Sequence, residues 1–562
     1  MPEGTPLEIE QNLPLQRLYH WARVRADAPY MTQPLGGGRM REFTWAETLR
    51  QVRCVAAWLQ RLQLAPGSRV GILSKNCAHW LMMDYAIWMA GHVSVPLYPT
   101  LMAESVHQIV ERSGMSALFV GKLDGWDTMK TGVPADLPLI GCELSPPGDF
   151  VRWEDVVAHT PPLQGEPVRR ADELATLIYT SGTTGAPKGV MHRFATFAAT
   201  SLTMKETFGF KENERMLSYL PLSHVAERIG TEANSLQVGA HVYFAESLET
   251  FQRDLQRARP TVFFSVPRLW VKFQQGVLAK MPARKLERLL RIPIARTLVK
   301  KKILRLLGLD AVRFAATGAA PLPEDVILWY RRLGLELLEV YGMTENFGLS
   351  HVTRPGQFRS GYVGSPWPHS ECRLAGSGEV LTRAPWTMMG YYEQPEKTAE
   401  VLGADGWLHT GDLGEIDAQG RLRITGRVKE LFKTSKGKYV APAPIENLLG
   451  RHTAIEAICV TGSGFPQPFA IAMLSAEAVH EAHDPVRHKV LETSLAELLK
   501  SVNACVDHHE QLSFIALVDT PWTVDNGLVT PTMKIKRNVL EKYYATQFEP
   551  WAAARSPVVW AF

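Results

Sequence analysis

A segment rich in glycine and hydroxyl side chains, residues 179–190 with the sequence YTSGTTGAPKGV, carries the clearest chemistry in the chain. Its glycines, Gly182, Gly185 and Gly189, permit left-handed backbone and let N–H groups approach an anion closely. Hydroxyl donors and one cation complete the set: Thr180, Ser181, Thr183, Thr184 and Lys188. These groups suit the phosphates of a nucleotide, although a flexible surface loop has a similar composition.

The segment differs from the P-loop, whose G-x-x-x-x-G-K-[ST] pattern places the lysine at the start of a helix. Here Pro187 precedes Lys188 and Gly189 follows it. Residues 173–179 alternate and are rich in branched side chains, which predicts a strand leading into the loop. The string S-G-T-T-G-x-P-K-G resembles the signature loop of the adenylate-forming superfamily, which includes acyl-CoA synthetases, luciferases and peptide-synthetase adenylation domains. The nucleotide that this resemblance implies is ATP.

Further segments follow in the order that this superfamily uses. Residues 221–228, PLSHVAER, resemble a motif whose histidine lies between the acyl pocket and the nucleotide. The resemblance implies that His224 helps to place the substrate carboxylate, although a lone histidine after a strand is more often structural. The sequence of this segment is more similar to long-chain acyl-CoA synthetases than to the acetate or aryl-acid enzymes.

Two segments are similar to those that surround the adenine. Residues 317–323, TGAAPLP, imply that Gly318, Ala319 and Ala320 line the adenine and the acyl tunnel. Residues 341–345, YGMTE, imply a role for each side chain or backbone group in turn. Tyr341 would stack on the adenine with Gly342 and Met343 beside it, Thr344 would bind a phosphate or carboxylate oxygen, and Glu345 would hold Mg²⁺ together with Thr184.

The ribose site and the hinge are implied by the next segments. Residues 406–412, GWLHTGD, match the pattern G-W-x-x-T-G-D, which implies that Asp412 accepts the ribose hydroxyls. Arg427 would be the second ribose contact, across a hairpin predicted at residues 417–420. Lys429 stands at the hinge position, where an aspartate or lysine changes its backbone angles as the small domain rotates.

The last two segments concern coenzyme A and the adenylation lysine. Residues 433–442, KTSKGKYVAP, resemble the segment that borders the pantetheine tunnel, with Gly437 as the backbone contact and Lys436 as a partner for the CoA phosphates. Residues 530–537, TPTMKIKR, resemble the C-terminal P-T-x-K element, which implies that Lys534 is the adenylation lysine. Many relatives carry glycine where Met533 stands. Lys536 is the alternative, because an extended segment would point it to the same side.

Together the resemblance implies a two-step ligase. With ATP and Mg²⁺ the enzyme would convert a medium- to long-chain fatty acid to an acyl-adenylate with release of pyrophosphate, and would then transfer the acyl group to CoA. Two alternatives stay open: an acyl-AMP ligase that loads a carrier protein, and a CoA ligase for an aryl or other hydrophobic acid.

The elements that must position these residues alternate between helix and strand. Thr44 and Glu47 predict a capping box, and the pattern that follows predicts strands at 69–73, 93–97 and 117–120 with helices at 78–90 and 104–113. We therefore expect an α/β fold with stacked, mostly parallel sheets and flanking helices, and ligands at the carboxyl ends of the strands. Residues 134–167, rich in proline and glycine, predict a surface connection. Beyond the N-terminal domain, residues 1–427, we expect a small mobile α+β domain over 428–562.

Composition and charge narrow the setting. The six cysteines lie far apart without metal-ligand spacing, which fits a reducing cytoplasm, and no apolar run reaches the roughly 18 residues of a spanning helix. The net charge of +4 gives no reason to expect a nucleic-acid partner, and a homodimer is left open. Between Arg268 and Arg305, cations alternate with leucine and isoleucine, broken by Pro282 and Pro293. This pattern fits either a solvated helix face or peripheral contact with an anionic membrane.

Overall fold

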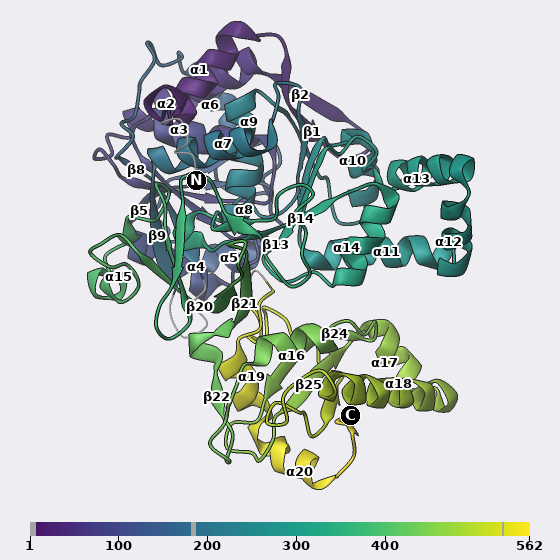
Figure 1. Cartoon of the computed structure of the whole chain (residues 1–562). Coiled ribbons are helices and arrows are strands. Elements are labelled where there is room, and N and C mark those ends of the chain that lie inside the picture. Colours follow the sequence, from purple (N-terminus) through teal and green to yellow (C-terminus); the bar gives the residue numbers. More distant parts are fainter. Residues whose placement is uncertain (1–6, 181–186, 531–532) are drawn as a thin grey trace. The chain divides into compact units, whose positions relative to one another are not determined.

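The computed structural model of the protein describes residues 7–180, 187–530 and 533–562 (Figure 1). The chain forms two compact units. The first takes residues up to 180, 187–372 and 382–408, and the second takes residues 373–381 and 409–562. The α/β class predicted from the sequence is confirmed. The domain boundary between residues 427 and 428, with its hinge at Lys429, stays a prediction. The compact units differ from it, because they group residues 373–381 and 409–427 with the C-terminal residues.

An eight-stranded sheet in the order β19-β9-β8-β4-β3-β5-β6-β7 is the largest of the first unit. From β8 to β7 the neighbouring strands are parallel. Strand β9 pairs antiparallel with β8, and β19 pairs antiparallel with β9. The strands are β3 (Arg69–Leu73), β4 (Val93–Leu97), β5 (Met115–Val120), β6 (Leu139–Gly141), β7 (Val151–Arg152), β8 (Leu174–Thr180), β9 (Lys188–Arg193) and β19 (Gly390–Tyr391). The helices that accompany them include α2 (Trp45–Arg61), α3 (Ala78–Met89), α4 (Ala103–Ser113), α5 (Trp126–Met129), α6 (Trp153–His159) and α7 (Phe194–Phe208).

Two predictions about this region need correction. The predicted surface connection at 134–167 contains β6, β7 and α6, and Trp153 is buried with its indole N–H donating to Gln51 at 2.7 Å. The strands are only 3 and 2 residues long, too short for their alternation to stand out among prolines and glycines. The capping box before α2 is half formed. Thr44 accepts the N–H of Glu47 at 3.1 Å, whereas the Glu47 carboxylate binds Arg50.

Two smaller sheets complete the first unit. One has the order β10-β11-β1-β2 and the other β12-β13-β14-β15-β16, parallel except at one edge of each. Their strands are β1 (Pro29–Pro34), β2 (Met40–Thr44), β10 (Arg215–Ser218), β11 (His241–Phe244), β12 (Val262–Ser265), β13 (Phe314–Gly318), β14 (Leu337–Tyr341), β15 (His351–Val352) and β16 (Ser365–Pro366). The remaining helices of the first unit are α1 (Pro14–Val24), α8 (Val225–Glu227), α9 (Asn234–Val238), α10 (Phe251–Ala258), α11 (Pro267–Lys280), α12 (Ala283–Arg291), α13 (Pro293–Leu307), α14 (Glu324–Leu333) and α15 (Pro395–Val401). Pro282 and Pro293 interrupt the basic stretch as predicted.

The second unit combines three sheets with helices of 6 to 19 residues. Strands β17 (Glu371–Leu374), β18 (Glu379–Arg383), β20 (Leu408–Ile416) and β21 (Leu422–Arg427) form one sheet, and β22 (Phe432–Lys433) pairs with β23 (Tyr439–Val440). The third sheet is mixed: β24 (Ile455–Thr461), β25 (Phe469–Leu474), β26 (Ile515–Val518) and β27 (Val558–Trp560). Its helices are α16 (Pro442–Leu449), α17 (Ala476–Ala482), α18 (Pro485–Asn503), α19 (Arg537–Tyr544) and α20 (Phe548–Ala553). No helix among the residues described is long and apolar enough to span a bilayer.

Candidate active site

The two ends of the glycine-rich loop are held together by the hairpin β8–β9. Thr180 pairs with Lys188 at the end of the hairpin from which the loop extends, while Ser181, Gly182, Thr183, Thr184 and Gly185 lie outside the described residues. Lys188 begins strand β9 and not a helix, which confirms the difference from the P-loop that Pro187 and Gly189 predict. Gly189 is needed for space and not for left-handed backbone, because a Cβ atom there would lie 3.1 Å from the Tyr179 ring.

Glu345 lies in a buried site near Lys188. A short 3₁₀ helix, Thr344–Asn346, follows β14 and buries the Glu345 side chain. The Tyr391 hydroxyl donates to Glu345 Oε1 at 2.8 Å, and Lys188 Nζ lies 4.6 Å from the centre of the Tyr391 ring. The Thr344 carbonyl lies 2.8 Å from His192 Nε2. Strand β19, which carries Tyr391, pairs with β9, which carries Lys188, so one edge of the large sheet brings cation and carboxylate together.

The segments expected around the adenine end on neighbouring strands. β13 and β14 run parallel, with Gly318 opposite Val340, so residues 318–320 and 341–343 leave the same edge of the sheet. Ala319 is exposed and has a φ of +69°. Residues other than glycine seldom adopt this backbone conformation, and it often marks a functional site. Gly342 allows a close backbone crossing, because a Cβ atom there would lie 2.2 Å from the Gly348 carbonyl oxygen.

His224 begins the short helix α8. Its Nδ1 atom accepts the N–H of Ala226 at 3.1 Å, which assigns the imidazole proton to Nε2. The following turns pack beside the Glu345 segment, since a Cβ atom at Gly348 would lie 3.9 Å from both Val225 and Ile229. Residues 228–233 form a π-helix, a distortion that is frequent at functional sites.

Asp412 and Arg427 face each other in the second unit. They are paired across the hairpin β20–β21, and Arg427 Nε donates to Asp412 Oδ1 at 2.7 Å. Thr410 anchors the strand by donating to the Val380 carbonyl at 2.7 Å. A buried carboxylate held by a guanidinium is a suitable acceptor for sugar hydroxyls, and the hairpin predicted at residues 417–420 is the element that creates the pair.

The remaining predicted residues of the second unit lie on exposed turns. Lys429 belongs to the 3₁₀ turn Val428–Glu430, and Gly437 has a φ of +80° in the turn between β22 and β23, beside exposed Lys436. Lys534 is exposed, and its backbone N–H and carbonyl are both bound to Thr530, at 3.0 and 2.8 Å. Met533 has a φ of +60°, which explains why glycine would suit this position.

Two family models cover most of the chain. The model described as AMP-binding enzyme matches residues 18–392, and the model of the AMP-binding enzyme C-terminal domain matches residues 430–552. The chain belongs to the AMP-binding enzyme family.

Curated relatives of this AMP-binding enzyme include long-chain-fatty-acid–CoA ligases. FadD15 of Mycobacterium bovis is 31% identical, over 93% of this chain and 95% of the relative. Long-chain-fatty-acid–CoA ligase 1 of Homo sapiens is also 31% identical, over 86% of this chain and 78% of the relative.

Solved structures show the same fold. The anthranilate CoA ligase AuaEII in complex with anthranoyl-AMP has a TM-score of 0.75 at 20% identity, over 94% of this chain and 97% of the other. The A-PCP didomain of the carboxylic acid reductase from Segniliparus rugosus, in complex with AMP, has a TM-score of 0.80 at 22% identity, over 97% and 84%.

Sequence reasoning missed Tyr391 and a row of ion pairs in the second unit of this AMP-binding enzyme. Glu430, next to Lys429, lies 3.8 Å from Arg427 and 3.9 Å from Arg537, and Arg537 lies 2.7 Å from Glu446. The row therefore joins the Asp412–Arg427 pair to the start of α19, which follows Lys534. Neither feature had a local sequence signal. Tyr391 lies outside the motifs named above, and Glu446 is 91 positions from Arg537, with Glu430 still further away.

Glu227, within the His224 motif, gives the enzyme a pH-dependent stability. Burial raises the pKa of its carboxyl from 4.5 to about 7, and the Thr231 hydroxyl donates to Oε1 at 2.9 Å. Below about pH 4.5 the carboxyl is protonated in both the folded and the unfolded protein, so its raised pKa does not change the free energy of unfolding. As the pH rises towards 7, the unfolded protein loses this proton more readily, and the folded protein becomes less stable. At about 1.4 kcal/mol per pH unit, Glu227→Gln is expected to stabilise the fold by about 3 kcal/mol near pH 8 and by little near pH 4.5. Urea unfolding at both pH values measures this difference, and an equal effect at both would contradict it.

Proposed function

We propose that the protein is a two-step, AMP-forming ligase that activates a medium- to long-chain fatty acid and transfers it to coenzyme A. The observation that carries the proposal is the grouping of Lys188, Tyr391 and Glu345 at the ends of the glycine-rich loop. This site offers a cation for phosphate oxygens and a buried carboxylate for a divalent cation. The long-chain-fatty-acid–CoA ligases that match over most of their length support the choice of substrate.

The first half-reaction must bring two anions together. The fatty acid carboxylate attacks the α-phosphate of ATP, forms the acyl–phosphate bond and expels pyrophosphate. In this proposal Lys188 and the loop residues bind the departing β- and γ-phosphates, and His224 and Thr344 orient the attacking carboxylate. Lys534 bridges the carboxylate and the α-phosphate as negative charge builds up. Tyr341 and residues 318–320 hold the adenine, while Asp412 and Arg427 hold the ribose.

The residues around Glu345 fit a magnesium ion. Among the described residues, no group of three or more acidic, histidine or cysteine side chains is arranged to hold a metal. A lone buried carboxylate suits Mg²⁺, which commonly takes one or two carboxylates and completes its shell with phosphates and water. Glu345 would hold the ion with Thr184, and the ion would supply charge neutralisation for the pyrophosphate.

Tyr391→Phe tests the support that Glu345 receives. Loss of the hydroxyl removes the 2.8 Å hydrogen bond that orients the carboxylate, and loss of such an outer partner typically weakens metal binding about 10- to 100-fold. We expect the Mg²⁺ concentration for half-maximal pyrophosphate release to rise by that factor. Tyr392→Phe, which removes the neighbouring hydroxyl, is the matched control. An unchanged Mg²⁺ requirement in Tyr391→Phe would contradict the assignment of the Mg²⁺ ion to the Glu345 site.

In the second half-reaction the CoA thiol attacks the acyl-adenylate, forms the thioester and releases AMP. Gly437 would contact the pantetheine through its backbone, and Lys436 would bind a CoA phosphate. Lys429 is the proposed hinge that exchanges Lys534 for the Gly437 turn between the two half-reactions. Its exposed position in a short turn supports this role, because few contacts oppose a change in its backbone angles.

A substrate panel tests the function. Fatty acids from short to very long, together with aryl acids, are offered with ATP, Mg²⁺ and either CoA or a phosphopantetheinyl carrier protein. The expected result is acyl-CoA and AMP from medium- and long-chain acids. Transfer to the carrier protein alone would identify an acyl-AMP ligase, and a preference for aryl acids would identify the second alternative. Absence of pyrophosphate release with every acid would reject both steps.

The proposed setting is the cytoplasm, with peripheral contact at the inner face of the membrane through the cations between Arg268 and Arg305. The cysteines of the structure are free thiols, which suits a reducing compartment. A homodimer is the proposed assembly. Light scattering from the purified chain would reject it if the mass were that of one chain at every concentration.

A further inference from the structure

Helices α12 and α13 carry a surplus of positive charge at the edge of the first unit (Figure 1). Twelve cations stand between Arg268 and Arg305 against one acid, Glu287, and Glu287 lies 3.7 Å from Arg332 of α14. The cations of α12 and α13 form no ion pair with any residue that the structure describes. Their charge is therefore not neutralised within this part of the chain, and it attracts anions from outside.

The outward face of α13 adds exposed aliphatic side chains to this charge. Its inward face is fixed, because Ile303 and Leu307 are buried and the Gln252 side chain donates to the Leu306 carbonyl at 2.8 Å. On the opposite face, Ile294 and Leu298 are 79% and 65% exposed and stand one helical turn apart. The cations Lys301, Lys302 and Arg305 continue that face.

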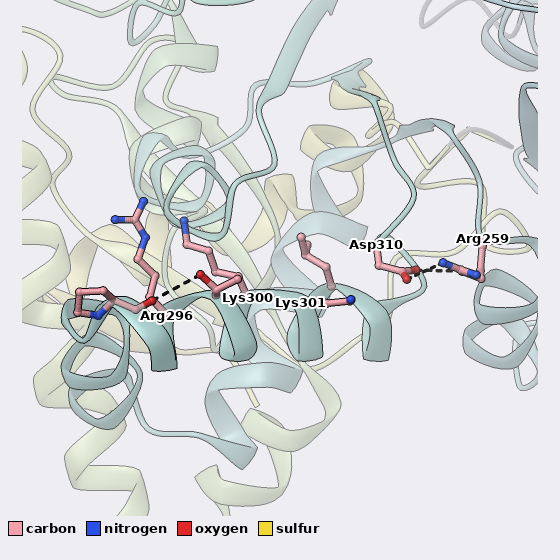
Figure 2. Close-up of a pocket in the computed structure, with 8 residues that line it drawn as sticks. Arg259, Arg296, Lys300, Lys301 and Asp310 are labelled. Atoms are coloured by element: carbon pink, nitrogen blue, oxygen red, sulfur yellow. Dashed lines mark hydrogen bonds and ion pairs between the residues drawn. The ribbon is translucent and has the colours of Figure 1, made fainter.

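A hollow of about 630 Å³ lies along the side of α13 (Figure 2). Its lining is Arg259, Pro293, Arg296, Thr297, Lys300, Lys301, Leu304 and Asp310. Asp310 is the one acid of the lining, and it is bound to Arg259 at 2.8 Å. The other cations repel one another: burial and the neighbouring Arg296 lower the pKa of Lys300. Arg296 and Lys300 lie on the same side of α13 as the buried Ile303 and Leu307, so the hollow is not part of the outward face.

We propose that the outward face of α13 docks on an anionic lipid bilayer. Ile294 and Leu298 enter the headgroup region, and the cations that continue their face, Lys301, Lys302 and Arg305, bind lipid phosphates. Charge alone would suit an acidic protein equally well, but aliphatic side chains beside cations fit a surface that is anionic outside and apolar beneath. The docking itself does not depend on the proposed function. Only its purpose does, which is to bring the enzyme to the bilayer into which fatty acids partition.

Vesicle co-sedimentation of the full-length chain tests the docking. We expect the protein to sediment with vesicles of phosphatidylcholine mixed with phosphatidylglycerol, to remain in solution with phosphatidylcholine alone, and to be released by salt. No sedimentation with the anionic vesicles, or equal sedimentation with both, would overturn the proposal.

Matched variants locate the surface. Lys301→Gln/Arg305→Gln should weaken binding about 30-fold, since each cation near an anionic surface contributes about 1 kcal/mol, or about 5-fold. Ile294→Ser/Leu298→Ser should weaken it about 10-fold or more. The controls lie on α18, where Lys489, Lys500, Val486 and Val490 are likewise exposed: Lys489→Gln/Lys500→Gln and Val486→Ser/Val490→Ser should bind as the wild type does. Equal losses in the α18 and α13 variants would overturn the assignment to α13.

Activity without vesicles separates this proposal from the proposed function. All four variants should form acyl-CoA from a dissolved medium-chain acid at the wild-type rate, because none of the altered side chains belongs to the proposed active site. A second experiment adds free glycerol phosphate to the enzyme bound to anionic vesicles. Competition that displaces the enzyme from anionic vesicles supports binding of lipid phosphates to the outward face of α13, whereas phosphate binding that leaves vesicle binding unchanged would overturn it.

Discussion

Lys534→Ala is expected to lower the rate of acyl-adenylate formation about 10²- to 10³-fold, which is the typical cost of removing one donor to a developing negative charge. The reaction joins a carboxylate to a phosphate that is itself anionic, so a cation between them is needed most in the transition state. Thioester formation from supplied acyl-adenylate should continue near the wild-type rate, because in the proposed mechanism the Gly437 turn has replaced Lys534 in the site when the thiol attacks.

Two assays on purified enzyme separate these steps: pyrophosphate release with fatty acid and ATP, and consumption of synthetic acyl-adenylate by CoA. Lys536→Ala is the matched control, since Lys536 is two residues further on and only half-buried before α19. Loss of adenylation in Lys536→Ala alone would transfer the role to that residue. If Lys534→Ala slowed both steps equally while its thermal unfolding stayed unchanged, the division of labour between them would be wrong.

The α/β class and several element bounds could be predicted because the signals are local. Strands β3 and β4 and helix α3 begin at the predicted residues, since alternation and apolar length set them directly. The short strands β6 and β7 could not be found. At 3 and 2 residues they take their stability from the neighbouring strand and not from their own sequence.

The positions of the predicted site residues follow from topology, whereas their partners do not. Parallel β13 and β14 place Gly318 and Tyr341 at one edge, as the sequence pattern predicts. Tyr391 reaches Glu345 from a two-residue strand, and Glu430 reaches Arg537 from more than a hundred positions away. Such contacts depend on three-dimensional packing, which one sequence does not encode as a local pattern.

The same limit applies to a cluster of charges in the core of the first unit. Arg228 is fully buried, with guanidinium nitrogens 3.0 Å from Asp84 and 3.0 Å from Glu232, which are also fully buried. Its guanidinium lies over the rings of Trp80 and Phe197, at 5.2 and 5.1 Å. One cation cannot balance two carboxylates, and burial raises the pKa of Glu232 well above its ordinary value. Burial therefore favours the protonated form of Glu232.

Arg228→Met is expected to lower the free energy of unfolding by about 3–5 kcal/mol, because it leaves buried carboxyl groups without their cation. Removing all the charges should reverse the loss: Asp84→Leu/Arg228→Met/Glu232→Leu should regain wild-type stability or exceed it, as apolar replacements of buried ion pairs often do. Arg50→Met is the control, since its pair with Glu47 is largely exposed and worth about 0–1 kcal/mol.

Urea unfolding followed by tryptophan fluorescence measures the three variants, because Trp80 lies against the cluster. A loss in Arg228→Met no larger than that in Arg50→Met would show that the ion pairs are not buried as described. Activity of the triple variant then decides what the charges are for. The His224 carbonyl accepts the N–H of Arg228 at 3.2 Å, so the cluster fixes the helix that His224 begins. Restored stability with restored activity would make the charges structural. Restored stability without adenylation would make them the device that positions His224.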